Sequence, residues 1–204
     1  MKNNKNISRK DRLKSKRLAP ANYLIVCEGK QTEPNYFNGL KKKINKNYGS
    51  KVDVLIPNIE IKGTGENTTA LVKYTDKFVN YSNKRYGQVW VVFDKAIKTC
   101  DYNVAWSNPN FELWLLSHFK KVNRYISKDN VLQELSKEFQ KKGLGEYTKN
   151  DTNIFEKVTS EERLHTAIKN CEYMEELNKD GQESRRNPMT KVYKIIDGLK
   201  EYLE

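Results

Sequence analysis

The chain has 204 residues, with 38 Lys and Arg against 26 Asp and Glu, and therefore a formal net charge of +12. This length supports one domain with a real core, and no run approaches the 18 consecutive apolar residues of a membrane-spanning helix. The three Cys contain no CxxC pair, which argues against a zinc site, and the positive charge favours a polyanion such as nucleic acid as partner.

The N-terminal segment is the most basic part of the chain. Residues 1–17 contain eight Lys or Arg against one acid, Asp11, and have almost no apolar content. We expect residues 1–19 to form a flexible arm, which either follows a phosphate backbone or is simply solvated. Residues 20–204 are expected to form a single α/β domain with a helical C-terminal extension.

The first apolar run, from Tyr23 to Cys27, has the length and β-branched content of a buried strand. It ends at Glu28-Gly29, and a second acid, Glu33, follows five residues later. A carboxylate at the carboxyl end of such a strand lies on the edge where open α/β sheets bind ligands. Glu28 is therefore either a metal ligand or a residue that caps the turn or pairs with Lys30.

The next segments alternate between helical and extended patterns. A helix is expected over residues 35–45, extended chain over 52–56 and 58–61, and a turn at Gly63-Thr64-Gly65. Asn67 is expected to cap a helix that continues to about Asn83. The residues expected on its buried face are Leu71, Val72, Tyr74, Thr75, Phe78 and Val79.

A second apolar run, from Gln88 to Phe93, is typical of a central parallel strand and ends at Asp94. In a parallel sheet Glu28 and Asp94 would lie on the same edge, which favours a metal site there. Residues 102–106 read as another strand, yet residues 94–101 are few for a parallel crossover. Either this connection is antiparallel, or, as we favour, a segment is missing between Lys95 and Ala96.

The remainder of the chain reads as mainly helical. Residues 111–119 form a strongly apolar helix with Glu112 near its first turn, where an acid either complements the helix dipole or adds a third carboxylate to the site. Further helices are expected over residues 128–142, about 154–178, and from Pro188 to Leu203. His118 and His165 lie within helical patterns and are expected to be structural or surface residues.

Three motifs occur in order: E-G-x-x-T-E at 28–33, F-D at 93–94 and S-N-P-N-F-E-L-W at 107–114. Together with N-P-M-T-K-V at 187–192, they resemble the RloB-like family, which is related to the AbiLii abortive-infection proteins and has a Toprim-like core. The resemblance implies a compact α/β fold with a mainly parallel sheet and an acidic metal site. The chain departs from the family after Lys95, where Ala96 stands in place of further Asp residues.

The resemblance also assigns expected site residues. Glu28 and Asp94 match the Toprim metal positions, Glu33 matches a second acid that some related nucleases use, and Glu112 is a looser match. These acids would hold Mg²⁺ or Mn²⁺, with the first three also catalytic. The expected nucleic-acid contacts are Lys30, Lys62, Arg185 and Arg186.

The implied function is a metal-dependent nuclease that cleaves DNA or RNA, with transfer RNA as one candidate, in abortive-infection defence against phage. The relatives imply a co-encoded ATPase partner that controls it. The alternative is a catalytically degenerate Toprim-like module that binds nucleic acid or a protein partner. A cytoplasmic location fits the cysteine pattern, and the oligomeric state stays open, with a homodimer as one option.

Overall fold

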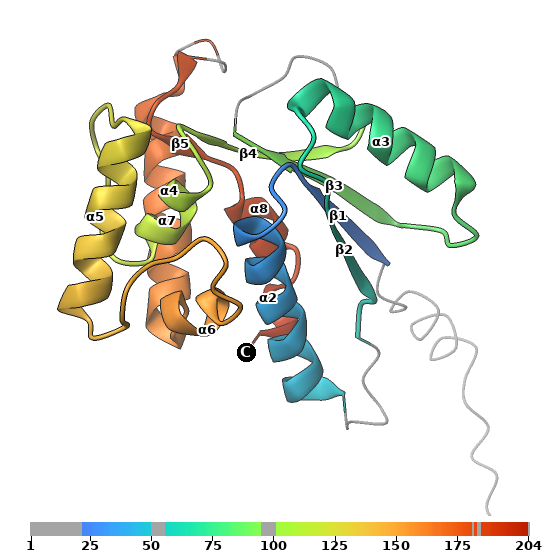
Figure 1. Ribbon diagram of the computed structural model, residues 1–204, viewed down its shortest axis with the longest axis horizontal. Helices are drawn as coiled ribbons and strands as arrows, with labels where there is room; N and C mark the ends of the chain where they lie inside the picture. Colours follow the sequence, from blue (N-terminus) through green and yellow to red (C-terminus); the bar gives the residue numbers. More distant parts are fainter. Residues whose placement is uncertain (1–21, 50–55, 95–100, 181, 183–184, 204) are drawn as a thin grey trace, which may run out of the picture.

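A single sheet organises the computed structural model, which describes residues 22–49, 56–94, 101–180, 182 and 185–203. Within those residues five strands occur in the order β2-β1-β3-β4-β5 (Figure 1). Their bounds are β1 Tyr23–Cys27, β2 Ile59–Gly63, β3 Gln88–Phe93, β4 Asn103–Asn108 and β5 Met189–Thr190. The first four strands are parallel to one another, and β5 is antiparallel to β4. The expected α/β class with a mainly parallel sheet is therefore confirmed.

The central strand β1 explains why its sequence is apolar without alternation. All five of its residues are buried, and it pairs with β2 on one side and with β3 on the other. A strand that is covered on both faces needs apolar side chains at every position. The expected strands at 23–27 and 88–93 are found with those bounds.

The pairing of β3 with β4 decides between parallel and antiparallel connections for this part of the chain. Trp90 pairs with Asn103 and Phe93 with Trp106 in parallel register, so the antiparallel alternative is wrong. The other alternative, a missing segment between Lys95 and Ala96, concerns residues that lie outside the described ranges. The same holds for the basic arm at 1–19 and for most of the extended segment at 52–56.

Helices surround the sheet unevenly. Their bounds are α2 Thr32–Tyr48, α3 Thr68–Tyr81, α4 Glu112–Ser117, α5 Lys128–Lys141, α6 Ile154–Val158, α7 Glu161–Leu177 and α8 Tyr193–Asp197, followed by the 3-10 turn η2 Lys200–Tyr202. Figure 1 shows α3 alone on one side of the sheet, with α2 and α8 on the other side and α4 to α7 grouped beside them. No helix in the described ranges has both the length and the apolar character needed to cross a bilayer.

Two helix predictions in the C-terminal half were wrong. The single helix expected over 154–178 is divided into α6 and α7, because Thr159 and Ser160 adopt extended backbone between them. The helix expected from Pro188 begins only at Tyr193, because Met189 and Thr190 instead pair with the edge of β4. The hydroxyls of Ser107 and Thr190 lie 2.8 Å apart in this pair.

The buried face of α3 is narrower than predicted. Leu71 and Thr75 are buried, whereas Tyr74 is 37% exposed. The prediction for Tyr74 was therefore wrong, and Val72, Phe78 and Val79 are only partly buried. The physical reason is that α3 contacts the sheet along one stripe and the described residues place no helix on its outer side, so four of the six predicted positions remain partly or fully accessible to solvent.

Candidate active site at the carboxyl edge of the sheet

The ends of β1 and β3 bring Glu28 and Asp94 together. The Glu28 N–H donates to the Val92 carbonyl (2.9 Å), and the Gly65 N–H donates to the Glu28 carbonyl (2.8 Å). The side chain then reaches across the edge, where Glu28 Oε2 accepts from the Asp94 N–H (3.3 Å) and from the Thr68 hydroxyl (3.4 Å). The carboxylate of Glu28 is thus placed by three neighbouring segments at once.

Glu33 enters the same region from the first turn of α2 and is only 8% exposed. Its carboxylate lies against the backbone of Gly29, and a Cβ at residue 29 would collide with it, so glycine is required for this close approach. Burial, together with the nearby charges of Asp94 and Glu112, raises the pKa of Glu33 to about 7, although backbone hydrogen bonds oppose this shift. Glu33 therefore exchanges its proton near neutral pH.

Glu112 reaches the site from the start of α4 and is 4% exposed. Its Oε1 accepts from the Tyr147 hydroxyl (3.0 Å) and lies 3.6 Å from Lys149 Nζ. The preceding residue is tied to the strand end as well, because the Phe111 N–H donates to Asp94 Oδ1 (3.2 Å). The loosest of the predicted site residues thus lies next to the others.

Two lysines approach these carboxylates from outside the predicted motifs. Lys128 Nζ, at the first position of α5, lies 3.0 Å from Asp94 Oδ2. The hydrogen bond with Asp94 raises the pKa of Lys128, and the charges of Glu112 and Glu28 raise it further. Lys149 lies in the loop between α5 and α6, which Thr32 pins by donating to the Lys149 carbonyl (3.2 Å). Lys128 and Lys149 therefore offset part of the negative charge.

Sequence reasoning missed Lys128, Lys149, Tyr147 and Thr68. Each lies in a segment that gives no local signal of chemistry, since lysines and tyrosines at helix starts and in polar loops are usually solvated. The signal becomes visible only when the fold places these segments against the acids. A partial clue was that Lys128 follows a capping serine, Ser127, which fixes the start of α5.

The four acids surround one cavity of about 410 Å³, which we call the carboxylate pocket. The side chains that line it include Glu28, Glu33, Asp94 and Glu112, and also Lys30 and Lys149. The structure thus brings together all four predicted metal ligands and one of the predicted nucleic-acid contacts. The other three contacts lie elsewhere: Lys62 pairs with Glu60 near α3, and Arg185 and Arg186 precede β5.

The donors around this pocket fit a hard divalent cation in their chemistry. Carboxylate oxygens are the ligands that Mg²⁺ and Mn²⁺ prefer, and Mg²⁺ needs few of them because it keeps several waters. Burial is the main cause of the raised pKa of Glu33, and the charges of Asp94 and Glu112 add to it. As the side chains stand, no three His, Cys, Asp or Glu in the described part of the chain are close enough to hold an ion directly. Coordination would thus require side-chain rotation or bridging water.

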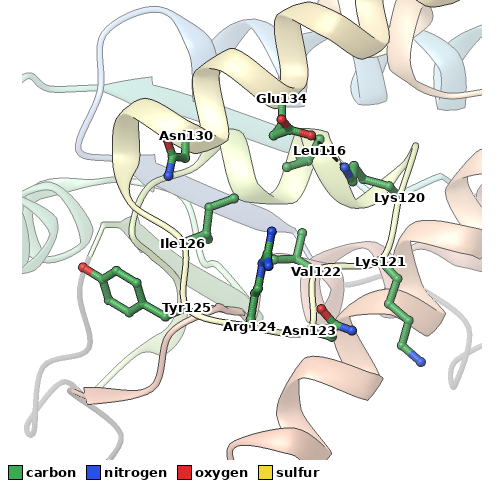
Figure 2. Close-up of a pocket in the computed structure, with 10 residues that line it drawn as sticks. All are labelled: Leu116, Lys120, Lys121, Val122, Asn123, Arg124, Tyr125, Ile126, Asn130 and Glu134. Carbon is green, nitrogen blue, oxygen red and sulfur yellow. Dashed lines mark hydrogen bonds and ion pairs between the residues drawn. The ribbon is translucent and has the colours of Figure 1, made fainter.

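A second pocket offers a contrast within the same molecule. It has a volume of about 390 Å³ and lies between the end of α4, the loop at 120–126 and α5 (Figure 2). Figure 2 shows Lys120 and Glu134 side by side, and their charged atoms are 2.7 Å apart. Tyr125 on the same loop is 75% exposed. We call this the loop pocket.

Comparisons with known proteins give one match. A family model described as RloB-like protein matches residues 23–199. No curated protein and no solved structure matches the chain. The matched range runs from the start of β1 through α8 and so contains all four acids of the carboxylate pocket.

Proposed function

The chain belongs to the RloB-like family, and we propose that it is a divalent-metal-dependent nuclease that cleaves the phosphodiester backbone of DNA or RNA. The observation that carries this proposal is the convergence of four carboxylates with Lys30 and Lys149 on one pocket at the carboxyl edge of a parallel sheet, where Lys128 also pairs with Asp94. This edge is where open α/β sheets bind ligands. The proposal includes the Toprim-like character of the core.

The acids in this proposal divide into two kinds. Glu28 and Asp94 stand at adjacent strand ends and would hold Mg²⁺ or Mn²⁺, with Glu112 in support. A bound cation would supply charge neutralisation at the phosphate and an acidified water. Glu33, with a pKa of about 7, is suited to accept and return a proton near neutral pH.

The lysines complete the arrangement. A phosphate that entered the pocket would carry negative charge into a group of carboxylates, so it needs cationic partners of its own. Lys128 and Lys149 are at the rim, with side chains 58% and 63% exposed, and each can turn from its acid toward an incoming phosphate oxygen. Lys30 lines the same pocket and would add a third contact.

The biological part of the proposal rests on the family. By its resemblance to abortive-infection proteins, we propose that the nuclease is the toxic effector of an anti-phage system and that a co-encoded ATPase controls it. The substrate is either DNA or RNA, with transfer RNA as one candidate. Co-expression with the neighbouring ATPase gene in a plaque assay tests this part: protection should require both proteins and should be lost with Asp94→Asn.

The second candidate function is a binding module without catalysis. It is favoured by the ion pairs of Asp94 with Lys128 and of Glu112 with Lys149, because in each pair a lysine already takes up part of the acid's charge. In that case the pocket would recognise a partner rather than cut a phosphodiester.

One experiment separates the two candidates. Purified protein, alone and with its ATPase partner, is incubated with single-stranded, duplex and structured DNA and RNA in Mg²⁺, in Mn²⁺ and in EDTA. The nuclease proposal expects cleavage that needs the cation and disappears with Glu28→Gln. Binding to these substrates without any cleavage, under every condition, would instead establish the binding module.

A further inference from the structure

An aromatic strip runs along one flank of α3, with Tyr74 and Tyr81 exposed and Phe78 partly buried against the core. Tyr74, Phe78 and Tyr81 are spaced by four and three residues, so they lie on one face of the helix. The rings of Tyr74 and Phe78 stack at 6.1 Å with an angle of 17° between their planes. Tyr81 is 87% exposed, more than any other large apolar side chain in the described residues. A helix that only covered a sheet would not need this face.

A groove adjoins the lower part of this strip. It has a volume of about 380 Å³ and lies between α3, β2 and the segment before β3. Phe78, Tyr81 and Tyr86 line it, together with Lys62 and Lys84. Lys62 Nζ sits 4.8 Å from the centre of the Phe78 ring, which places a cation over an aromatic face. The groove thus combines flat rings with ammonium groups.

The charge around the strip favours an anionic partner. Residues 59–87 carry five Lys or Arg against three acids. One of those acids, Glu60, is already held by Lys84 (2.9 Å), Lys62 (3.2 Å) and the Tyr86 hydroxyl, and these contacts lower its pKa to about 2. Lys77 is exposed and lies on the same face as Tyr74 and Tyr81, since it is three and four residues from them.

The strip is connected to the carboxylate pocket. Thr68, the first residue of α3, donates to the carboxylate of Glu28 (3.4 Å). The helix then runs away from the pocket over 14 residues, a length of about 20 Å. Figure 1 shows α3 on a side of the sheet where the described residues form no other helix, and Tyr74 and Tyr81 are exposed on it. A flexible polymer on the strip would have one end at the carboxylates.

We propose that the aromatic strip and its groove form a docking surface for single-stranded nucleic acid, whose bases stack on the exposed rings of Tyr74 and Tyr81, with Phe78 supporting the Tyr74 ring. Exposed aromatic rings beside lysines are how proteins bind single strands without sequence preference, since every base offers a flat face and every nucleotide a phosphate. A duplex hides its base faces and would gain little from the strip. Cleavage of a bound strand at the carboxylate pocket would depend on the proposed nuclease function. Binding of the strand to the docking surface would not, since it requires no metal chemistry.

The test measures binding separately from cleavage. Fluorescence anisotropy with labelled single-stranded DNA and RNA, and with the matching duplexes, is recorded in EDTA so that no cation-dependent cleavage occurs. We expect Tyr81→Leu and Tyr74→Leu each to weaken single-strand binding about tenfold, in line with the loss of one stacked base. Tyr125→Leu is the matched control, because Tyr125 is 75% exposed but lies on the loop pocket. It should change binding by less than about twofold.

A second arm tests the lysines. Lys84→Met should reduce affinity for every single strand by a similar factor and make the logarithm of affinity depend less steeply on salt, with a slope smaller by about 0.7. Circular dichroism of each variant confirms that the fold is retained. An unchanged salt dependence, with unchanged affinity, counts against the lysines as phosphate contacts and against the docking surface.

Three results would overturn the proposal: no binding of single strands by the wild type, equal binding of single strands and duplexes, or strip variants that bind like the wild type. Sedimentation of the wild type and of Tyr81→Leu tests whether a second copy of the chain occupies the strip. If the wild type is a dimer that dissociates on this substitution while oligonucleotide binding is unchanged, the strip is a dimer interface and the docking proposal fails. Glu28→Gln keeps the two proposals apart. If this variant still cleaves, the nuclease assignment fails while the docking surface stands.

Discussion

The carboxylate pocket and the loop pocket have similar volumes, about 410 and about 390 Å³, and both contain carboxylates beside lysines. Their acids nevertheless behave in opposite ways. In the loop pocket Glu134 lies between Lys120 (2.7 Å) and Lys137 (2.8 Å), and these cations lower its pKa to about 2. In the carboxylate pocket the pKa of Glu33 is raised to about 7.

The difference comes from where each acid sits in the fold. Glu134 lies on α5 with its side chain 30% exposed, so it can pair with Lys120 and Lys137 and still be solvated by water. The carboxylate pocket takes its acids from the ends of β1 and β3 and the starts of α2 and α4. Glu33 is buried there, and loss of solvation is the main cause of its raised pKa. A buried acid with a raised pKa beside other carboxylates is therefore the feature that distinguishes this candidate active site from an ordinary polar hollow.

The largest effect is expected when an acid of the carboxylate pocket, rather than one of the loop pocket, is replaced. Glu28→Gln should lower cation-dependent cleavage on the order of 10³-fold, because it removes a proposed metal ligand without changing the side-chain shape. Glu134→Gln is the matched control in the loop pocket and should leave the rate within about twofold. The measurement is the initial rate of cleavage in Mg²⁺, with melting temperatures to confirm folding. Equal losses in both variants would show that the pocket acids have no special part.

The second effect concerns pH and Glu33. Its carboxyl has an ordinary pKa of 4.5 in the unfolded chain and about 7 in the folded protein, so the folded state binds more protons between these values. Its contribution to stability is therefore full below pH 4.5 and is lost as the pH rises through 7. Glu33→Gln should be more stable than the wild type at pH 8, by up to about 3 kcal/mol.

Thermal unfolding in chelator at pH 5 and pH 8 checks this expectation. The comparison must be made between variants at each pH, because His118, whose pKa burial lowers to about 4, contributes in the opposite direction. Its stabilisation is full above pH 6.5 and lost as the pH falls. Glu134→Gln should not gain stability at pH 8. A Glu33→Gln advantage that was the same at pH 5 and pH 8 would exclude the raised pKa as its cause.

A smaller effect is expected from the lysines of the carboxylate pocket. Lys128→Met should lower cleavage about tenfold, because the phosphate loses one charge-assisted hydrogen bond. Lys128→Arg should restore part of the rate, which a purely structural contribution of Lys128 to α5 would not predict. Steady-state kinetics on one substrate provide the measurement. The assignment fails if Met and Arg at this position give the same rate.

The smallest effect is expected in the loop pocket. Lys120→Met removes one partner of Glu134, whose side chain is 30% exposed and keeps its contact with Lys137. Exposed ion pairs contribute less than about 1 kcal/mol, so the melting temperature should fall by no more than about 3 °C. A larger loss would mean that the loop pocket is as strongly coupled electrostatically as the carboxylate pocket, and the contrast between them would disappear.

Sequence reasoning succeeded where a single physical requirement acts on a whole segment. β1 and β3 were predicted with their bounds, because a strand covered on both faces, as all of β1 and the second half of β3 are, must be apolar there. The neighbouring positions of Glu28 and Asp94 followed from the parallel arrangement alone. Both results depend on local composition and on one rule of topology.

The remainder depended on contacts between distant segments. The two residues of β5 carry no periodicity, and they form a strand only because the edge of β4 is available to them. Lys128, Tyr147 and Lys149 belong to the site only because α5 and the following loop fold back over α4. Tyr74 fits a buried helical position by spacing, but the described residues place no other helix over the outer side of α3 (Figure 1), and Tyr74 is exposed there.

The backbone at residue 28 has a consequence for how such a protein can change over evolutionary time. Its N–H and carbonyl are held by Val92 and Gly65 through backbone hydrogen bonds that any residue except proline could make. A lineage could therefore replace the acid at this position and retain the same folded scaffold and the same strip on α3. If the proposed nuclease activity holds, its loss and the loss of the fold would be separate events, and a descendant that binds without cutting would be one substitution away.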